Sequence, residues 1–143
     1  MELEDLKKVY DKVVIRESKS PYHFDASVKR TEEVLAYNPM CGDKYKLQLH
    51  SETGQVDDIH FHGFGCALSK ASTSAMIRWV EGKTLSEVKA ECEKFLATID
   101  GKEKHTFDQE VLKVLVELND LGSRSDCIKL SWKALLEYLE EKH

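Results

Sequence analysis

Three of the four cysteines in this 143-residue chain lie beside turn-forming residues, and one of them is followed two positions later by an acid. Cys41 and Asp43 belong to the stretch "NPMCGD", Cys66 follows "HGFG", and Cys127 follows "GSRSD". Thiolates and carboxylates are ligands for tetrahedral zinc, and thiolates also hold iron–sulfur clusters. These residue types therefore favour either a metal site or thiols that attack an electrophilic sulfur.

The predicted secondary structure separates these cysteines from the fourth. Cys66 and Cys127 fall at predicted helix N-termini, where free amide groups and the helix dipole are expected to lower a thiol's pKa. Cys92 instead shares one helical face with Val88 and Phe95, at spacings of three and four residues. We therefore predict that Cys92 is a small apolar residue of the core.

Strands come first and helices later in the predicted order of elements. An amphipathic stripe predicts a first helix, and a surface loop without periodicity follows it. Alternating apolar residues then predict three strands joined as an antiparallel meander, and four helical segments complete the chain. The expected fold class is α+β, with a three-stranded antiparallel sheet and about five helices packed mainly on one face. The predicted helices cover residues 2–17, 66–82, 84–101, 107–120 and 126–143, and the strands cover 32–38, 44–50 and 56–64.

This meander predicts where the site residues meet. Each hairpin reverses the chain, so the loop after the first strand and the end of the third strand lie at one edge of the sheet. Cys41, Asp43 and Cys66 can converge there, and Cys127 completes a four-ligand set if the last helix starts nearby. The alternative is three unrelated loop thiols, because the spacings match no standard zinc finger.

A second candidate ligand pair lies on the third predicted strand. His60 and His62 share one strand face, and His50 lies on the neighbouring strand. A His-x-His pair on a strand can bind metal. On the polar face of a half-covered sheet, however, solvated histidines are the more common outcome.

Composition narrows the classes of function. The formal charge of −5, without a long basic run, argues against nucleic acid as a partner. No segment has the length and apolarity of a membrane span or a signal peptide, so we expect a cytoplasmic protein without disulfides. The length and even composition predict a single domain over residues 1–143.

Two motifs and a positioned third cysteine resemble a known family. "NPMCGD", "GFGCALSKAS" and a Cys followed by "IKLSWKALLEYL" occur in the order found in the U-type iron–sulfur cluster assembly proteins, which include IscU, SufU and the N-terminal domain of NifU. The resemblance implies a role in iron–sulfur cluster assembly with a cysteine desulfurase and downstream assembly components. It also implies that Cys41, Asp43, Cys66 and Cys127 are metal ligands.

Details of the sequence resemble the SufU branch. IscU-type members have a His where this chain has Asp126, the segment 97–118 resembles an insertion of SufU-type members, and Arg124 matches an Arg of that branch. The branch implies a bound zinc and transfer of persulfide sulfur from a SufS-type desulfurase, with Cys41 as the sulfur acceptor. Such zinc-dependent sulfurtransferase activity has one close alternative, a scaffold that assembles a transient [2Fe–2S] cluster on the same ligands.

Other interpretations remain open beside these two. Arg124 is either a support for a persulfide anion or a solvated surface residue. Asp126 adds a second carboxylate beside the site, and the segment 17–23 keeps only the proline of the family's N-terminal stretch. A structural zinc module is a third possible function. A cysteine hydrolase ranks last, because no motif supplies a His base.

Overall fold

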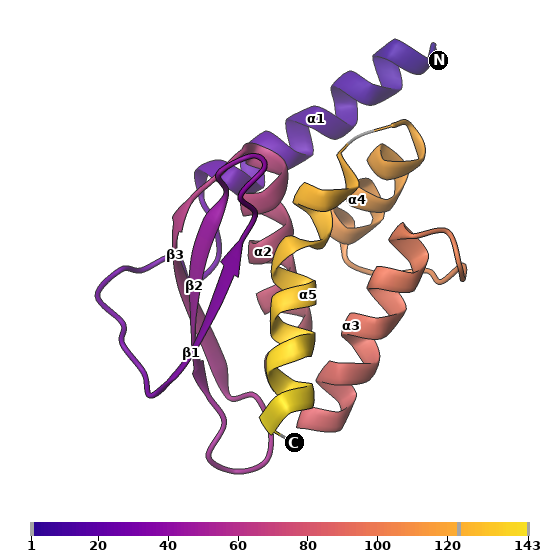
Figure 1. Ribbon diagram of the computed structural model, residues 1–143. Coiled ribbons are helices and arrows are strands. Elements are labelled where there is room, and N and C mark those ends of the chain that lie inside the picture. The colour runs from indigo at the N-terminus through magenta and orange to yellow at the C-terminus, as the bar shows by residue number, and fades with distance from the viewer. Residues whose placement is uncertain (1, 123, 143) are drawn as a thin grey trace.

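The computed structural model describes residues 2–122 and 124–142. Within them the chain forms three antiparallel strands and five helices, which confirms the predicted α+β class (Figure 1). The predicted helix and strand ranges differ from the observed ones by a few residues. The elements are α1 (Leu3–Lys19), β1 (Glu32–Tyr37), β2 (Lys44–His50), β3 (Asp58–Phe64), α2 (Ala67–Val80), α3 (Leu85–Ile99), α4 (Glu110–Asp120) and α5 (Ser125–Lys142).

The sheet has the order β1-β2-β3, and its apolar face comes from alternation along the strands. In β2, Tyr45, Leu47 and Leu49 are buried, while Lys44 and Lys46 are exposed. The register pairs Leu47 with the buried Val34 of β1 and with the buried Phe61 of β3. A shift of one residue would turn this whole apolar set toward solvent, so the pattern fixes the register.

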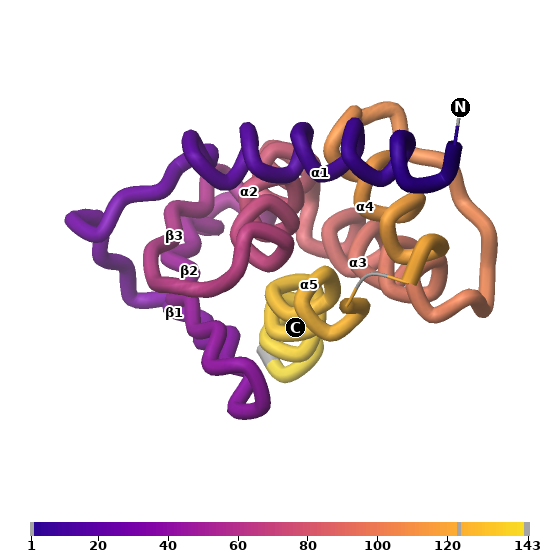
Figure 2. Tube along the Cα trace, turned by 90° about the horizontal axis from the view of Figure 1, so that it is seen from above, coloured from indigo at the N-terminus to yellow at the C-terminus, as the bar shows by residue number. Residues whose placement is uncertain are grey.

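The helices form two layers on the apolar face of the sheet. α2 and α5 lie against the strands, α3 and α4 pack outside them, and α1 runs across α2 and α4 (Figure 2). The stacked rings of Phe95 on α3 and Trp132 on α5, with centroids 4.0 Å apart, join the two layers. Cys92 is fully buried in this core, as its helical spacing predicted.

One predicted surface loop is more ordered than its sequence suggested. The segment between α1 and β1 runs beside β3, where Phe24 forms a parallel bridge with Phe61. The ring of His23 stacks on the ring of His60, with centroids 4.2 Å apart. The segment between α1 and β1 covers this end of the outer sheet face. His60 is therefore half-buried and not simply solvated. No helix within residues 2–122 and 124–142 is long and apolar enough to cross a membrane.

Candidate metal centre

The loop 38–43 brings Cys41 and Asp43 to the upper end of the sheet in Figure 1, where α5 also begins. The loop closes on itself, because the Gly42 amide donates to the Asn38 carbonyl at 2.8 Å and the Asn38 amide donates to the Asp43 carbonyl at 2.9 Å. The Asn38 side chain accepts the Met40 amide at 3.0 Å. Gly42 has a φ of 80°, a value that favours glycine. The Asn, Pro and Gly of this stretch therefore form the turn that presents its thiol and its carboxylate.

The four predicted site residues converge at this end of the sheet. Single ligand atoms of Cys41, Asp43 and Cys127 lie within 4.8 Å of one another. The Sγ atom of Cys66 lies 3.6 Å from Oδ2 of Asp43. The antiparallel meander predicted this meeting of Cys41, Asp43 and Cys66, and the start of α5 adds Cys127. Unrelated loop thiols would not share one position in space.

Cys66 is held by the first turn of α2. It is the N-cap residue, and its sulfur accepts the Ser69 amide at 3.5 Å. Its own amide donates to Oδ1 of Asp43 at 3.1 Å. One carboxylate oxygen therefore fixes the chain at the helix start, while the other faces the Cys66 sulfur. Helix N-termini stabilise negative charge, so this position suits a thiolate ligand.

Buried hydroxyl groups connect α2 to α5 and set Cys127 beside Cys66. The Ser72 hydroxyl donates to the Ile128 carbonyl at 2.6 Å, and the Trp132 indole donates to the same hydroxyl at 3.0 Å. The Thr73 and Ser131 hydroxyls lie 2.6 Å apart. An apolar helix contact would tolerate sliding, whereas these directional bonds fix the alignment of the two helix starts.

The predicted effect of the helix start on Cys127 is wrong. Cys127 is only 2% exposed, and its burial raises the pKa of its thiol instead of lowering it. A hydrogen bond with Cys66 raises this pKa further, as do the negative charges of Cys66, Asp43 and Cys41. Desolvation and like charge outweigh the dipole of one helix. The acidic groups around Cys127 therefore favour its protonated thiol until a cation compensates their charge.

The donor set fits zinc. Tetrahedral zinc binds thiolate sulfur at about 2.3 Å, which places neighbouring sulfur ligands about 3.8 Å apart. The 3.6 Å between Cys66 Sγ and Asp43 Oδ2 is close to that spacing, and the 4.8 Å limit on the ligand atoms of Cys41, Asp43 and Cys127 is compatible with it. Three sulfurs and one oxygen also match the ligand types of an iron–sulfur site, so the geometry by itself does not choose the metal.

Comparison with known proteins assigns the chain to a family. Residues 9–116 match the model of the NifU-like N-terminal domain. The chain belongs to this family. Cys127 lies beyond the matched range, but a longer match includes it. The iron–sulfur cluster assembly scaffold protein IscU of Streptococcus pyogenes serotype M1 is 33% identical, over 98% of this chain and 88% of that protein.

Further members of the family carry two different functional names. The zinc-dependent sulfurtransferase SufU of Bacillus subtilis is 33% identical, over 68% of this chain and 67% of its own length. Among solved structures, one from Fervidobacterium islandicum AW-1, assigned as an iron–sulfur cluster assembly scaffold of the SUF system, superposes with a TM-score of 0.75 at 27% identity. That match covers 92% of this chain and 97% of the other. Family membership is therefore shown, whereas the SufU branch stays a prediction.

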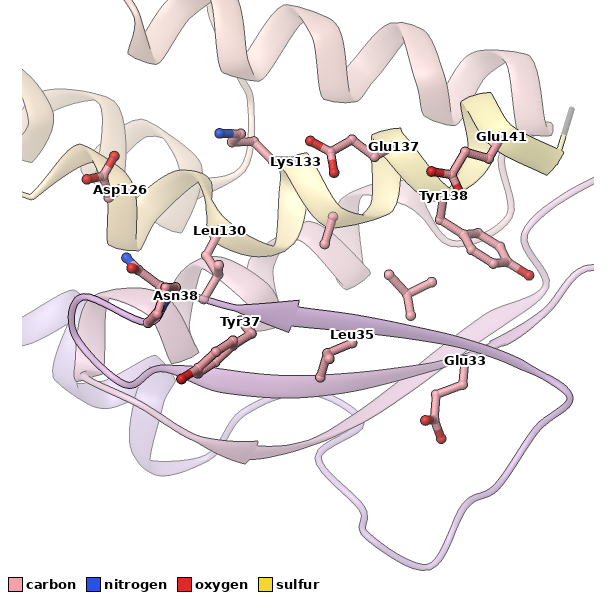
Figure 3. A pocket seen from close by; sticks show the side chains of 13 residues that line it. Glu33, Leu35, Tyr37, Asn38, Asp126, Leu130, Lys133, Glu137, Tyr138 and Glu141 are labelled. Atoms are coloured by element: carbon pink, nitrogen blue, oxygen red, sulfur yellow. The ribbon is translucent and has the colours of Figure 1, made fainter.

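Three other candidate groups lie apart from the four ligands. Asp126 is exposed and, with Asn38, lines a groove of about 470 Å³ between β1 and α5 (Figure 3). Arg124 is exposed at the start of α5. Among the described residues, the ligand atoms that lie within 4.8 Å of one another belong to Cys41, Asp43 and Cys127, and Cys66 joins them through its contact with Asp43. Asp126 and the histidines of β3 are not in this cluster.

Sequence reasoning missed the hydroxyl groups beneath the centre. Tyr45 lies at an apolar position of the alternating pattern in β2, yet its hydroxyl lies 2.7 Å from the hydroxyl of Ser69. The run "SKASTS" on α2 held a usable signal, because small polar residues at helical spacing on an otherwise buried helix need partners inside the protein. Single-chain periodicity does not identify those partners.

Proposed function

We propose that this chain is a zinc-dependent sulfur acceptor for iron–sulfur cluster assembly, which takes persulfide sulfur from a SufS-type cysteine desulfurase and passes it to downstream assembly components. One observation carries the proposal. Cys41, Asp43 and Cys127 bring ligand atoms within 4.8 Å of one another, with Cys66 beside them. The proposal also treats residues 1–143 as one functional domain that works in the cytoplasm.

Cys41 is the best-placed sulfur acceptor. It is half-buried on a loop, next to Met40, whose side chain is 91% exposed. Cys127 and Asp43 are buried, and Cys66 is anchored at its helix start by bonds with Asp43 and Ser69. A partner can therefore reach Cys41 from outside, while the other three residues keep their places.

The transfer step is a thiol–disulfide type of exchange. The Cys41 thiolate attacks the outer sulfur of the desulfurase persulfide, and a new sulfur–sulfur bond forms on Cys41. The old sulfur–sulfur bond breaks, its electron pair leaves with the desulfurase cysteine as a thiolate, and the proton of the persulfide stays on the transferred sulfur. No external oxidant or reductant is required. Once that proton is lost to solvent, Arg124, close to the site in sequence, would steady the persulfide anion on Cys41.

A bound metal would set the protonation state of these thiols. Bound zinc would keep its cysteine ligands as thiolates and would protect Cys41 from oxidation until a partner ligand replaces it. Cys66, Asp43 and Cys127 would retain the metal during that exchange. Asp43 is a weaker ligand than a thiolate, and a site that has to exchange one ligand benefits from such a member.

A scaffold that holds a transient [2Fe–2S] cluster is the second candidate. It is favoured by the long match to a protein named as a scaffold, which covers 98% of this chain. The same four residues would then bind the cluster. Anaerobic reconstitution with iron and sulfide separates the two functions. Stable cluster absorbance with loss of zinc supports the scaffold, and retained zinc with sulfur on Cys41 supports the acceptor.

The deciding test combines metal analysis with sulfur transfer. Purified wild type is expected to contain about one zinc per chain, as four protein ligands predict. It should accelerate a SufS-type desulfurase, and peptide mass spectrometry should find one additional sulfur atom on Cys41. Cys41→Ala should abolish the acceleration, while Cys92→Ala, which removes a buried thiol outside the site, should preserve it.

Two outcomes would reject the proposal. An unchanged desulfurase turnover with Cys41→Ala, together with retained zinc, would indicate a purely structural metal module. A metal-replete preparation without bound zinc or iron would show that the converged ligands do not form a metal site.

A further inference from the structure

A pair of buried hydroxyl groups lies directly behind the candidate metal centre. Tyr45 points inward from β2 and is 0% exposed, and Ser69 in the first turn of α2 is 1% exposed. Their oxygen atoms lie 2.7 Å apart. Neither residue belongs to the proposed ligands. A tyrosine hydroxyl buried in an apolar core needs a partner, and here that partner contacts Cys66.

Ser69 contacts Cys66 in three ways. Its amide donates to the Cys66 sulfur at 3.5 Å, and its hydroxyl donates to the Cys66 carbonyl at 3.1 Å. Its hydroxyl oxygen also accepts a hydrogen bond from the Cys66 thiol at 3.7 Å. The first turn of α2 therefore presents one fixed donor to the Cys66 sulfur, and a hydroxyl that can turn its proton from the Cys66 carbonyl to the sulfur once the thiol has lost its own proton.

The hydrogen bond with Tyr45 orients the Ser69 hydroxyl. The two hydroxyls share one hydrogen bond, so one of them donates and the other accepts. The Ser69 hydroxyl donates to the Cys66 carbonyl, so Tyr45 is assigned as the donor of the pair.

We propose that Tyr45 and Ser69 are positioning residues of the metal centre, which form a hydroxyl relay that orients the Cys66 sulfur and stabilises its negative charge when it binds metal. The inference rests on the proposed metal site. Partners of this kind around first ligands commonly change metal affinity about 10- to 100-fold when they are removed. Here the relay would act on the ligand that stays in place while Cys41 exchanges.

The chain passes so close to this relay that residue 65 has to be glycine. A Cβ atom on Gly65 would lie 2.3 Å from the Tyr45 hydroxyl, 2.7 Å from the Ser69 hydroxyl and 2.9 Å from Oδ1 of Asp43. Three oxygen atoms thus surround one backbone position next to Cys66. This crowding supports the relay independently of the hydrogen bonds, because it shows that the oxygens are packed against the ligand's own backbone.

The test removes one hydroxyl group at a time and measures metal binding directly. Ser69→Ala removes the hydroxyl but keeps the amide, and Tyr45→Phe removes only the phenol oxygen. Tyr138→Phe is a matched control, because its hydroxyl bonds Glu32 at 3.0 Å between α5 and β1, away from Cys66. Each protein is loaded with Co²⁺ and titrated with Zn²⁺ against a chelator.

The expected result is a change in the thiolate–cobalt bond. A hydrogen bond stabilises the sulfur lone pairs, so both site variants should shift the sulfur-to-cobalt charge-transfer band to lower energy. Zinc affinity should fall roughly 10-fold for Ser69→Ala. For Tyr45→Phe it should fall about 2- to 10-fold, the range of one neutral hydrogen bond. Tyr138→Phe should change neither the band nor the affinity.

The outcomes separate this inference from the proposed function. Wild type that binds no metal rejects the proposed function itself. Wild type that binds metal normally, with Tyr45→Phe and Ser69→Ala unchanged in band position and affinity, overturns the relay alone. Thermal unfolding of the metal-free variants controls for loss of structure. A variant that weakens zinc binding only in proportion to its loss of fold stability, with an unshifted band, also rejects the relay.

Discussion

Two equally buried thiols in this molecule have opposite surroundings. Cys92 on α3 is 0% exposed and Cys127 on α5 is 2% exposed. Burial is the largest cause of a raised thiol pKa in both. Around Cys92 the neighbours are the apolar core residues, whereas Cys127 faces Cys66, Asp43 and Cys41. Burial alone therefore does not distinguish a core thiol from a ligand, and the polar groups that converge on it do.

The largest effect, on zinc content, is expected when Cys127 and Cys92 are replaced by alanine one at a time. Cys127→Ala should lose stoichiometric zinc, since one of four ligands is gone, whereas Cys92→Ala should keep it. Without metal, each variant should lose about 1 kcal/mol of unfolding free energy, as removal of one buried heavy atom costs in cores. With zinc at about 100 times its Kd, wild type and Cys92→Ala should each gain about 2.7 kcal/mol, and Cys127→Ala should not.

Chemical unfolding with and without zinc, beside elemental analysis, measures both quantities. Equal zinc contents in the two alanine variants would show that Cys127 is no more important for zinc binding than the core thiol Cys92.

A second prediction asks whether the site is packed as tightly as the core. Gly65→Ala would press a methyl group on the Tyr45 and Ser69 hydroxyls, and overpacking of this kind costs about 1–3 kcal/mol. It should also weaken zinc binding, because Oδ1 of Asp43 lies in the same space. Gly54→Ala is the control, since a Cβ atom there meets nothing within 4 Å and only its φ of 83° is unfavourable. Thermal unfolding and zinc titration of both variants measure the difference, and equal losses would mean that the site is loosely packed.

The sequence predicted the elements well because each has a strong local signal. Alternation in β2 and β3 fixed the sheet, and a capping box of Thr84 and Glu87 starts α3. The meeting of Cys41 with Asp43 follows from two residues of separation in one closed loop. The meeting with Cys66 follows from meander topology. Local rules and the hairpin rule are therefore enough for three of the four candidate ligands.

The remaining features depend on contacts between distant segments. Periodicity places Ser69 and Tyr45 on their elements, but their pairing needs the packing of α2 on the sheet. The pKa of Cys127 was predicted in the wrong direction, because the helix start is visible in sequence while the depth of burial is not. The bridge between Phe24 and Phe61 likewise joins a segment without periodicity to a strand.

A third prediction loosens the contact that aligns the two helix starts. Ser72→Ala leaves the Trp132 indole and the Ile128 carbonyl without their shared partner, which should cost about 1–3 kcal/mol of stability. Zinc affinity should fall as well, because Cys127 would lose its fixed position relative to Cys66. Thr98→Ala is the control, since the Thr98 hydroxyl donates to the Lys94 carbonyl of its own helix. If both variants lose stability but keep full zinc affinity, the hydroxyl contact between α2 and α5 does not position the site.

The smallest effect is a dependence on pH that distinguishes the two thiols. Burial raises the pKa of the Cys92 thiol above its ordinary value of 9.0, so the folded chain keeps a proton that the unfolded chain loses. This stabilising contribution is complete below pH 9 and is lost as pH rises further, at up to about 1.4 kcal/mol per pH unit for each such thiol. Metal-free Cys92→Ala should therefore show a shallower decline between pH 9 and 10 than wild type.

Between pH 6 and 8, zinc binding should depend on the protonation of the site thiols and not on that of the core thiol Cys92. Thiol ligands have to lose their protons to bind metal, so zinc affinity should rise between pH 6 and 8, where Cys92 stays protonated in both the folded and unfolded chain. Zinc titrations over that range should give the same slope for wild type and Cys92→Ala. A different slope for Cys92→Ala would mean that the core thiol is coupled to the metal centre, and the separation between the two environments would then fail. An equal slope would show that converging ligands, rather than burial, make a cysteine responsive to metal.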